Sequence, residues 1–253
     1  MVDIEVHGNV LVMKINRPEA RNAVNGDVAQ GIEAGIDRLE SDDSLWVGVL
    51  TGTREFFCAG ADLKLINAGK PAEMMTPNGG FGGIVTRQRT KPLIAAVEGP
   101  ALAGGLEIVL SCDLLVASRE SRFGIPEVKR SLVAAAGGVF RLPRVLPKNV
   151  AYELGLTGDP ISAERAYQLG LVNELADPGA ALETALALAA RVAANAPVAV
   201  QKTRALMEEL VDADDEVGIR RSNEVMFELM NTEDFSEGLT AFIEKRPPAW
   251  KGR

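Results

Sequence analysis

The sequence predicts a mixed fold of the α/β or α+β class, with strands in the first half of the chain and a helical C-terminal region. Short, continuously apolar runs occur at residues 45–50 and 93–97, as expected for strands that are covered on both faces, and residues 113–117 predict another strand. After residue 180, apolar residues recur at helical spacing instead. Neither an internal repeat nor a linker divides the 253 residues, so two independent domains are not expected.

The first half alternates strands with turns and one clear helix. Residues 10–15 are apolar and partly β-branched, and turn residues at 16–19 end this strand. A helix is predicted over about 27–39, because Ile32, Ile36 and Leu39 share one helical face. Residues 68–89 include four glycines between positions 78 and 83. Since glycine raises the entropy cost of ordering, we expect a mobile segment there.

The chain is expected to be almost wholly helical after about residue 145. An alanine-rich helix is predicted over 180–194, and Pro197 precedes a second helix over 198–211. Two more helices are expected over 215–230 and 233–245, before Pro247 and Pro248 end the helical pattern. Because the predicted strands precede the predicted helices along the chain, we infer the mixed fold class.

Charge and composition argue against several classes of function. Lys and Arg total 27 against 35 Asp and Glu, which gives a formal net charge of −8. A nucleic-acid surface would need a basic stripe, so any anionic ligand must be held by a local basic cluster. The N-terminal residues lack the features of a signal peptide, and no uncharged run approaches the roughly 20 residues of a membrane span. We therefore expect a cytoplasmic protein with no membrane partner.

The two cysteines and the single histidine do not predict a metal site. Cys58 and Cys112 each lie in an apolar context, so they are expected to be buried thiols rather than a disulfide. No cluster of cysteine and histidine occurs at the spacing of metal ligands.

Two glutamates stand where a carboxylate is costly. Glu107 lies within the apolar run 103–110, and Glu127 ends the segment 123–127. Burial of an unpaired carboxylate costs several kcal/mol unless it gains partners or stays protonated. A structural role as a helix cap remains possible for each residue taken alone. Together, they favour a pair that transfers protons.

Two glycine-containing segments could supply main-chain donors beside these carboxylates. Residues 56–64 follow a predicted strand, and their small side chains would let a ligand approach the backbone. Residues 99–105 follow another strand and open an apolar helix, whose free N–H groups favour negative charge. If the N–H groups of Ala61 and Gly104 converge, they form a two-donor oxyanion hole.

These segments resemble the crotonase (enoyl-CoA hydratase/isomerase) superfamily across nearly the whole chain. The matching stretches are residues 17–23, 59–64, 103–107, 123–127, 156–158, 166–172 and 241–246. The resemblance implies a crotonase-like ββα spiral core over 1–195 and a helical C-terminal lid and trimerisation region over 196–253. It also implies a homotrimer or a hexamer built as a dimer of trimers.

The resemblance implies an enoyl-CoA hydratase, a hydro-lyase that adds water in syn fashion to a 2-trans-enoyl-CoA to give the 3-hydroxyacyl-CoA. Glu107 and Glu127 match the two catalytic glutamates of the hydratases, while Ala61 and Gly104 match the oxyanion-hole amides. The other positions that match substrate-binding residues are Arg21, Ala23, Ala59, Asp62, Leu63, Lys64, Phe242 and Lys245. Coenzyme A would be part of the substrate, with no separate cofactor.

Other functions on the same scaffold stay open at this point. An enoyl-CoA isomerase, a dehydratase working in reverse and a carnitine-type (crotonobetainyl-CoA) hydratase all share the implied site. A non-catalytic CoA-ester or RNA-binding relative is disfavoured by the two glutamates and by the acidic charge. Ile125 and the loop 132–138 make the implied pocket more apolar than in many hydratases, which leaves the acyl preference open. The glycine-rich segment 78–83 could open to admit a longer or bulkier acyl group.

Overall fold

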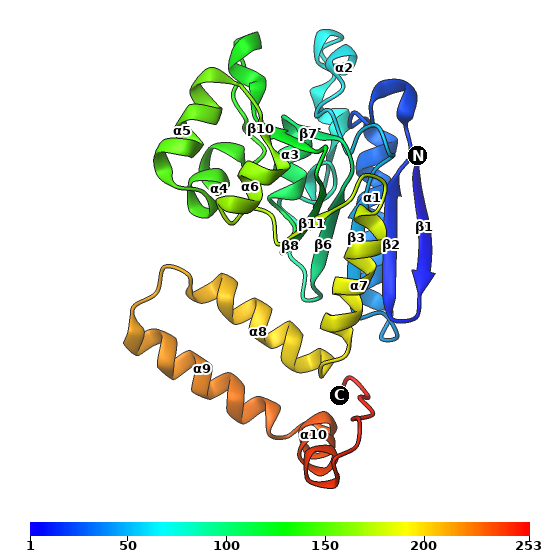
Figure 1. Cartoon of the computed structure of the whole chain (residues 1–253), viewed down its shortest axis with the longest axis vertical. Helices are drawn as coiled ribbons and strands as arrows, with labels where there is room; N and C mark the ends of the chain where they lie inside the picture. The colour runs from blue at the N-terminus through cyan, green and yellow to red at the C-terminus, as the bar shows by residue number, and fades with distance from the viewer.

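The structure is a computed structural model that describes residues 1–253, and its core is a mixed α/β arrangement (Figure 1). The main sheet has six strands in the order β1-β2-β3-β6-β8-β11. They are β1 (Val2–His7), β2 (Val10–Ile15), β3 (Val47–Thr51), β6 (Leu93–Val97), β8 (Leu114–Ser118) and β11 (Glu174–Ala176). β1 and β2 form an antiparallel hairpin, and every other neighbouring pair is parallel. The strands predicted in the first half are therefore confirmed, with small shifts at their ends.

Two smaller sheets accompany the main one. β10 (Ile161–Ser162), β9 (Arg122–Gly124) and β7 (Pro100–Leu102) form a three-stranded sheet in that order. β4 (Met75–Thr76) and β5 (Gly80–Phe81) form a short hairpin. The expectation of an almost wholly helical chain after residue 145 is wrong at β10 and β11. These strands have two and three residues, which is too short to show a periodic pattern.

Ten α-helices surround and extend the sheets. They are α1 (Gly26–Ser41), α2 (Leu63–Asn67), α3 (Gly104–Val109), α4 (Gly138–Val145), α5 (Lys148–Thr157), α6 (Ala163–Gln168), α7 (Ala181–Ala193), α8 (Pro197–Leu210), α9 (Asp215–Leu229) and α10 (Glu233–Glu244). Three 3₁₀ turns are η1 (Pro18–Ala20), η2 (Pro71–Met74) and η3 (Pro126–Arg130). None of the helices is long and apolar enough to cross a bilayer.

Helices α1 and α7 cover opposite faces of the main sheet. Alternate residues of a strand point to opposite faces, so Leu11 and Met13 join the core cluster that contains the buried face of α1. Val10 and Val12 join a second cluster with Ala185 of α7. Because both faces are buried at the inner strands β3, β6 and β8, these strands lack polar alternation, which explains their apolar sequences.

The glycine-rich segment 78–83 is packed rather than loose, contrary to the expected mobility. The side chain of Glu33 on α1 accepts hydrogen bonds from Asn78 Nδ2 and from the N–H of Gly79, at 3.0 and 3.3 Å. A Cβ atom on Gly83 would lie 2.1 Å from the carbonyl oxygen of Ala29, and its φ is +72°. The glycines thus permit close contact with α1, a requirement that composition alone does not reveal.

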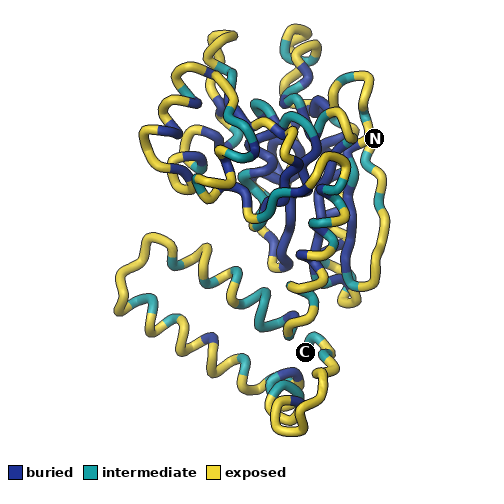
Figure 2. The backbone as a smooth tube through the Cα atoms, viewed as in Figure 1, coloured by how far each residue is buried: buried dark blue, intermediate teal, exposed yellow.

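Helices α8–α10 extend away from the core as an arm, much of which is exposed (Figures 1 and 2). An ion-pair network fastens α8 to the core: Asp113 bonds both Arg89, whose side chain is 3% exposed, and Arg204 of α8. Arg204 also donates to the carbonyl oxygen of Arg89 at 2.7 Å. The carboxylate of Asp113 therefore compensates a buried guanidinium and holds the arm.

Replacing Asp113 by alanine is expected to lower the free energy of unfolding by about 3–5 kcal/mol, because Arg89 would remain buried without its carboxylate. Urea denaturation followed by circular dichroism measures this loss. Asp177→Ala is the matched control, since Asp177 pairs with Arg119 on the surface and should barely change stability. Equal midpoints for the two variants would contradict the assignment.

Candidate active site

The pairing of β7 with β9 brings the two glutamates together. The strands are parallel neighbours, with Leu102 opposite Gly124. Helix α3 follows β7 and carries Glu107, whereas η3 follows β9 and carries Glu127. Both elements therefore begin at the same edge of the small sheet. The N–H of Ala103 also donates to the carbonyl oxygen of Gly124 at 2.9 Å, which joins the two connections directly.

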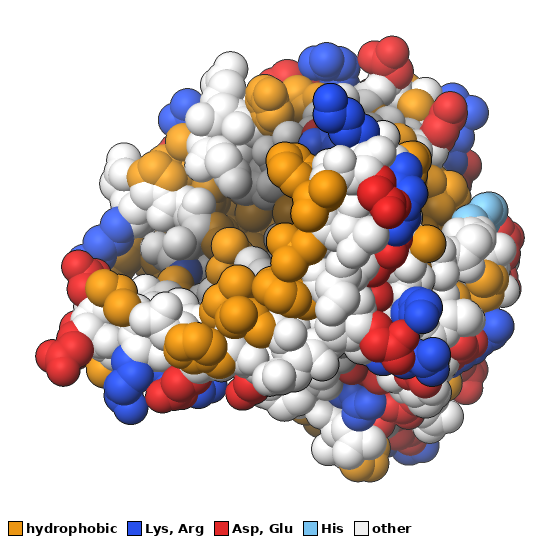
Figure 3. All heavy atoms as spheres, turned by 90° about the horizontal axis from the view of Figure 1, so that it is seen from below, with side chains coloured by type: hydrophobic (Ala, Val, Ile, Leu, Met, Phe, Trp, Pro, Cys, Tyr) orange, Lys and Arg blue, Asp and Glu red, His pale blue; other side chains and the backbone are white.

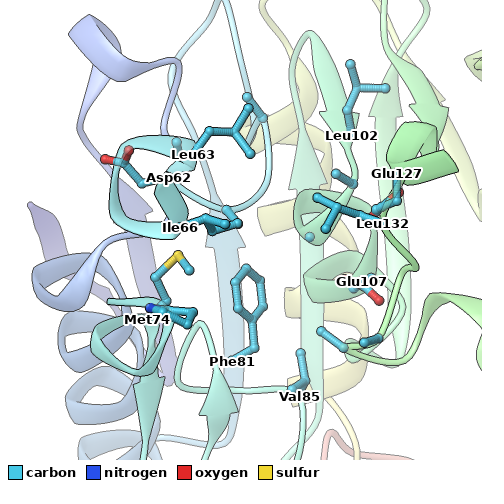
Figure 4. Close-up of a pocket in the computed structure, with 18 of the residues that line it drawn as sticks. Asp62, Leu63, Ile66, Met74, Phe81, Val85, Leu102, Glu107, Glu127 and Leu132 are labelled. Carbon is cyan, nitrogen blue, oxygen red and sulfur yellow. The ribbon is translucent and has the colours of Figure 1, made fainter. Parts of the chain in front are cut away.

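Both glutamates line one large cavity of about 860 Å³. Figure 4 shows Glu107 and Glu127 on one side of it, facing a wall that includes Leu63, Ile66 and Met74. The carboxylates thus lie beside each other, as the sequence interpretation requires, and apolar groups surround much of the space in front of them.

Glu107 is almost completely buried, and this sets its protonation. Burial, assisted by the nearby charge of Glu127, raises the pKa of Glu107 to about 7. A hydrogen bond from the N–H of Gly138 to Glu107 Oε1, 2.8 Å long, acts in the opposite direction because it favours the carboxylate. A group that titrates near neutrality can both accept and donate a proton.

Glu127 has a buried oxygen with no partner. Its Oε2 atom makes no hydrogen bond, although it is removed from solvent. Burial raises the pKa of Glu127 as well, while its own amide and the charge of Arg130 act against this shift. Buried polar atoms are nearly always paired, so this atom marks a position for a water molecule or a substrate group.

Two main-chain N–H groups lie free beside the glutamates. The N–H of Val24 donates to the carbonyl oxygen of Gly60, and the carbonyl oxygen of Val24 accepts from the N–H of Asp62. The N–H of Ala61, which lies between these two residues in the sequence, has no backbone partner. Gly104 is the first residue of α3, and its N–H has no acceptor within the helix. Both residues line the cavity.

Gly60 allows these two segments to approach each other. Its φ is +99°, a left-handed value that favours glycine. A Cβ atom on Gly60 would lie only 3.0 Å from the nitrogen of Gly104. The two N–H donors are therefore carried by closely packed backbone segments that line one cavity, an arrangement compatible with an oxyanion hole.

A second part of the cavity is built around a buried ion pair. Arg17 Nη1 bonds Asp62 Oδ2 at 2.8 Å and donates to the carbonyl oxygen of Ala23 at 2.9 Å. Asp62 also caps α2 by accepting from the N–H of Lys64, and these contacts lower its pKa despite the opposing effect of burial. Figure 4 shows the Asp62 carboxylate on the wall opposite the glutamates.

Arg21 lies at the same end in a left-handed backbone conformation. Its φ is +53°, and its carbonyl oxygen accepts from the N–H of Ala59 at 3.1 Å. The fully buried Asn22 holds this turn, because its side chain accepts from the N–H of Arg17 and donates to the carbonyl of Phe56. These contacts leave Arg21, Ala23 and Ala59 on the cavity wall.

The structure brings together ten of the twelve predicted site residues. Those that line the cavity are Arg21, Ala23, Ala59, Ala61, Asp62, Leu63, Lys64, Gly104, Glu107 and Glu127. Phe242 and Lys245 do not. They lie at the end of α10, on the arm, where Phe242 is 84% exposed. Within one chain, these two residues are therefore not part of the site.

Sequence reasoning missed several residues that shape the cavity. Arg17 lies within a motif that carries the family resemblance, but no role was assigned to it. Arg141 of α4 also lines the cavity, and its only signal was its position after the glycines of the loop 132–138. Phe81 and Val85 reach the cavity from the segment that was expected to be mobile.

The arrangement can add or remove a proton beside a polarised carbonyl group. Two free N–H donors can stabilise negative charge on an oxygen, and one buried and one half-buried carboxyl group can exchange protons with an adjacent carbon or water. No three His, Cys, Asp or Glu side chains form a group that could hold a metal ion. Cys58 is buried and Cys112 partly buried, and both are free thiols.

The chain is similar over nearly its whole length to proteins of one family. Residues 5–253 match the family model described as Enoyl-CoA hydratase/isomerase. Enoyl-CoA hydratase EchA19 of Mycobacterium tuberculosis is 36% identical over 256 residues, which cover 99% of this chain and 96% of that protein.

Solved structures agree. A crystal structure of an enoyl-CoA hydratase from Mycobacterium tuberculosis has a TM-score of 0.95 and 46% identity, and the match covers 100% of this chain and 99% of that one. A carnitinyl-CoA hydratase from Mycobacterium avium has a TM-score of 0.80 and 44% identity over 100% and 98% of the two chains. These likenesses confirm the predicted fold class.

Proposed function

Since this chain belongs to the enoyl-CoA hydratase/isomerase family, we propose that it catalyses the reversible syn addition of water to a 2-trans-enoyl-CoA, giving the 3-hydroxyacyl-CoA. The enzyme is a hydro-lyase that acts on CoA thioesters. One observation carries the assignment of water addition to this site: the buried carboxyl group of Glu107 and the half-buried one of Glu127 line the same cavity as two N–H groups without backbone partners.

The proposed reaction uses the four groups in two steps. The N–H groups of Ala61 and Gly104 bind the thioester carbonyl oxygen, on which negative charge develops. Glu107 and Glu127 hold a water molecule between them. As the water loses a proton to a carboxylate, its oxygen bonds to C3, and the double-bond electrons move into the enolate. A carboxylic acid, Glu127 in our assignment, then protonates C2 and restores the carbonyl group. Transfer of the proton taken from water to Glu127 returns the pair to its starting state.

Coenzyme A is the part of the substrate that fits the opposite end of the cavity. We assign the adenine to the backbone around Arg21, Ala23 and Ala59, with Leu63 and Lys64 alongside. The ion pair between Arg17 and Asp62 forms part of this wall. Because the catalytic groups are side chains and amides of the chain, the proposal requires no separate cofactor.

The acyl end of the cavity suits an apolar group longer or bulkier than a crotonyl chain. Its wall includes Met74, Phe81, Val85, Leu132 and Phe140. Apolar linings favour apolar ligands, and polar groups in such sites chiefly fix orientation.

A panel of acyl-CoA esters tests both the reaction and the acyl preference. We expect loss of the conjugated enoyl-thioester absorbance with 2-trans-enoyl-CoAs, and a higher kcat/KM for chains longer than crotonyl-CoA. A sharp optimum at crotonyl-CoA would contradict the acyl assignment. Turnover of 3-enoyl-CoAs without hydration would replace the hydratase proposal with an isomerase. Tight acyl-CoA binding with no turnover across the panel would favour a non-catalytic relative.

A carnitine-type hydratase is the second candidate, because a carnitinyl-CoA hydratase is among the similar structures. Its substrate carries a quaternary ammonium group in the acyl part. The cavity of this chain holds the guanidinium of Arg141 in its wall, and like charges repel in a low-dielectric site. Crotonobetainyl-CoA belongs in the panel, where we expect it to be the poorer substrate.

We further propose that residues 1–195 form the catalytic core and that residues 196–253 form a lid and trimerisation region. Large apolar side chains are exposed along the arm, including Met207, Ile219, Phe227 and Phe242. Figure 3 shows hydrophobic side chains gathered around a hollow on the face seen from below. Large apolar patches on a surface mark interaction sites. A homotrimer, or a hexamer of two trimers, would cover them and could bring Phe242 and Lys245 to a neighbouring nucleotide site.

The cytoplasm is the proposed compartment.

A further inference from the structure

Arg141 is a half-buried cation whose hydrogen bonds all go to neutral oxygens. Its guanidinium donates to Ser111 Oγ at 2.9 Å, to the carbonyl oxygen of Val85 at 2.6 Å and to that of Ala136 at 3.5 Å. None of these acceptors is a carboxylate. A guanidinium removed from water without a directly bound anion is costly, so its place in the cavity wall calls for an explanation.

The acceptors of Arg141 belong to segments that surround Glu107. The hydroxyl of Ser111 donates to the main-chain carbonyl of Glu107 at 2.8 Å, which ties the guanidinium to helix α3. Ala136 lies in the loop that leads to Gly138, whose N–H holds Glu107 Oε1. The N–H of Arg141 also donates to the carbonyl of Gly137 at 2.9 Å.

On the basis of the proposed hydration reaction, we propose that Arg141 is a positioning residue. Its guanidinium clamps the helix that carries Glu107 to the loop whose amide binds the Glu107 carboxylate, and it thereby fixes where that carboxylate points. The guanidinium of Arg141 makes no hydrogen bond to Ala61, Gly104 or either glutamate side chain, so the proposed role acts on the reaction through Glu107.

The charge of Arg141 supports the same role. Burial lowers the pKa of Arg141, and among the neighbouring charges Glu107 on α3 opposes this shift most, followed by Glu208 on α8. Arg144 on α4 and Arg89 act in the same direction as burial. In return, Arg141 lowers the pKa of Glu107, against the effects of burial and of Glu127. The cation thus helps to keep Glu107 ionised near neutral pH.

Two variants of Arg141 separate the clamp from the charge. Arg141→Lys keeps the charge but loses the forked donors, so kcat for 2-enoyl-CoA hydration should fall while the acid limb of the pH profile stays in place. Arg141→Gln loses both: kcat should fall by roughly 10- to 100-fold with little change in KM. Its acid limb should also move to higher pH, because Glu107 is protonated more easily without the cation.

Arg144→Gln removes the same charge from the exposed side of the same helix and is expected to behave like the unmodified enzyme.

A measurement without turnover makes the test independent of the proposed reaction. Protonated carboxyl groups give an infrared band, and the part of this band that disappears in Glu107→Gln belongs to Glu107. Its intensity as a function of pH reports the titration of Glu107 in the full-length protein. Its midpoint should lie at higher pH in Arg141→Gln. An unmoved midpoint, or an unchanged kcat, would overturn the positioning role and leave Arg141 as a structural residue. A shifted midpoint in a chain that hydrates no enoyl-CoA would instead uphold the role and refute the hydratase proposal.

Discussion

Replacing Glu107 or Glu127 by glutamine is expected to lower kcat for hydration by roughly 10²–10⁴-fold, the usual contribution of a proton-transferring side chain. Glutamine has nearly the same shape, so the cavity should keep its acyl-CoA affinity. It can neither take a proton from water nor give one to carbon. Stopped-flow or steady-state loss of the enoyl-thioester absorbance measures the effect.

The double variant distinguishes a cooperating pair from two independent groups. If both carboxyls hold one water molecule, removing the second should cost little beyond the loss from the first. Glu98→Gln is the matched control, because Glu98 is also buried but accepts from the N–H of Ala181 at the start of α7, outside the cavity. Full activity in either single variant at the cavity would refute the two-carboxylate mechanism.

Removing the N–H of Ala61 should have the second large effect. In Ala61→Pro the chain loses this donor, while the bridge to Val24 uses the neighbouring carbonyl and amide and can persist. One oxyanion-hole donor is worth roughly 10²–10³ in kcat, so hydration should fall by that factor. Ala61→Val adds a side chain of similar size and keeps the N–H, which makes it the control for crowding.

Affinity for a saturated acyl-CoA separates the two explanations of any loss. The donor acts chiefly on charge that develops in the transition state, so Ala61→Pro should bind butyryl-CoA nearly as well as Ala61→Val does. A pair of variants with equal kcat would show that the Ala61 amide does not contact the developing oxyanion.

The parts of the site that could be predicted from the sequence are those fixed by local pattern. Glu107 and Glu127 were detectable because a carboxylate in an apolar run is rare and costly. Ala61 and Gly104 were detectable because each follows a strand within a run of small residues. The strands β7 and β9, which hold these groups together, have three residues each and give no periodic signal.

Other features depend on contacts between distant residues and could not be predicted from local pattern. The glycines at 79–83 suggested mobility, but the partner that orders them, Glu33, lies more than forty positions earlier in the chain. The role of Arg141 could not be predicted from its position after the loop 132–138 either, because its bonds to Val85 and Ser111 span 56 and 30 positions. Phe242 and Lys245 lie outside the cavity of a single chain, so their predicted role depends on assembly.

The proposed oxyanion donors are main-chain groups, whereas the proposed acid and base are side chains. This difference determines how the reaction could change by substitution. In the proposed mechanism, the donors for the thioester oxygen are peptide amides, which survive almost any exchange of side chains. The proposed acid and base are two side chains on η3 and on the short helix α3, both anchored to one small sheet. On this proposal, activation of the thioester is a fixed property of the scaffold. One or two amino-acid substitutions at the glutamates could therefore change the reaction while the amides that bind the carbonyl oxygen stay in place.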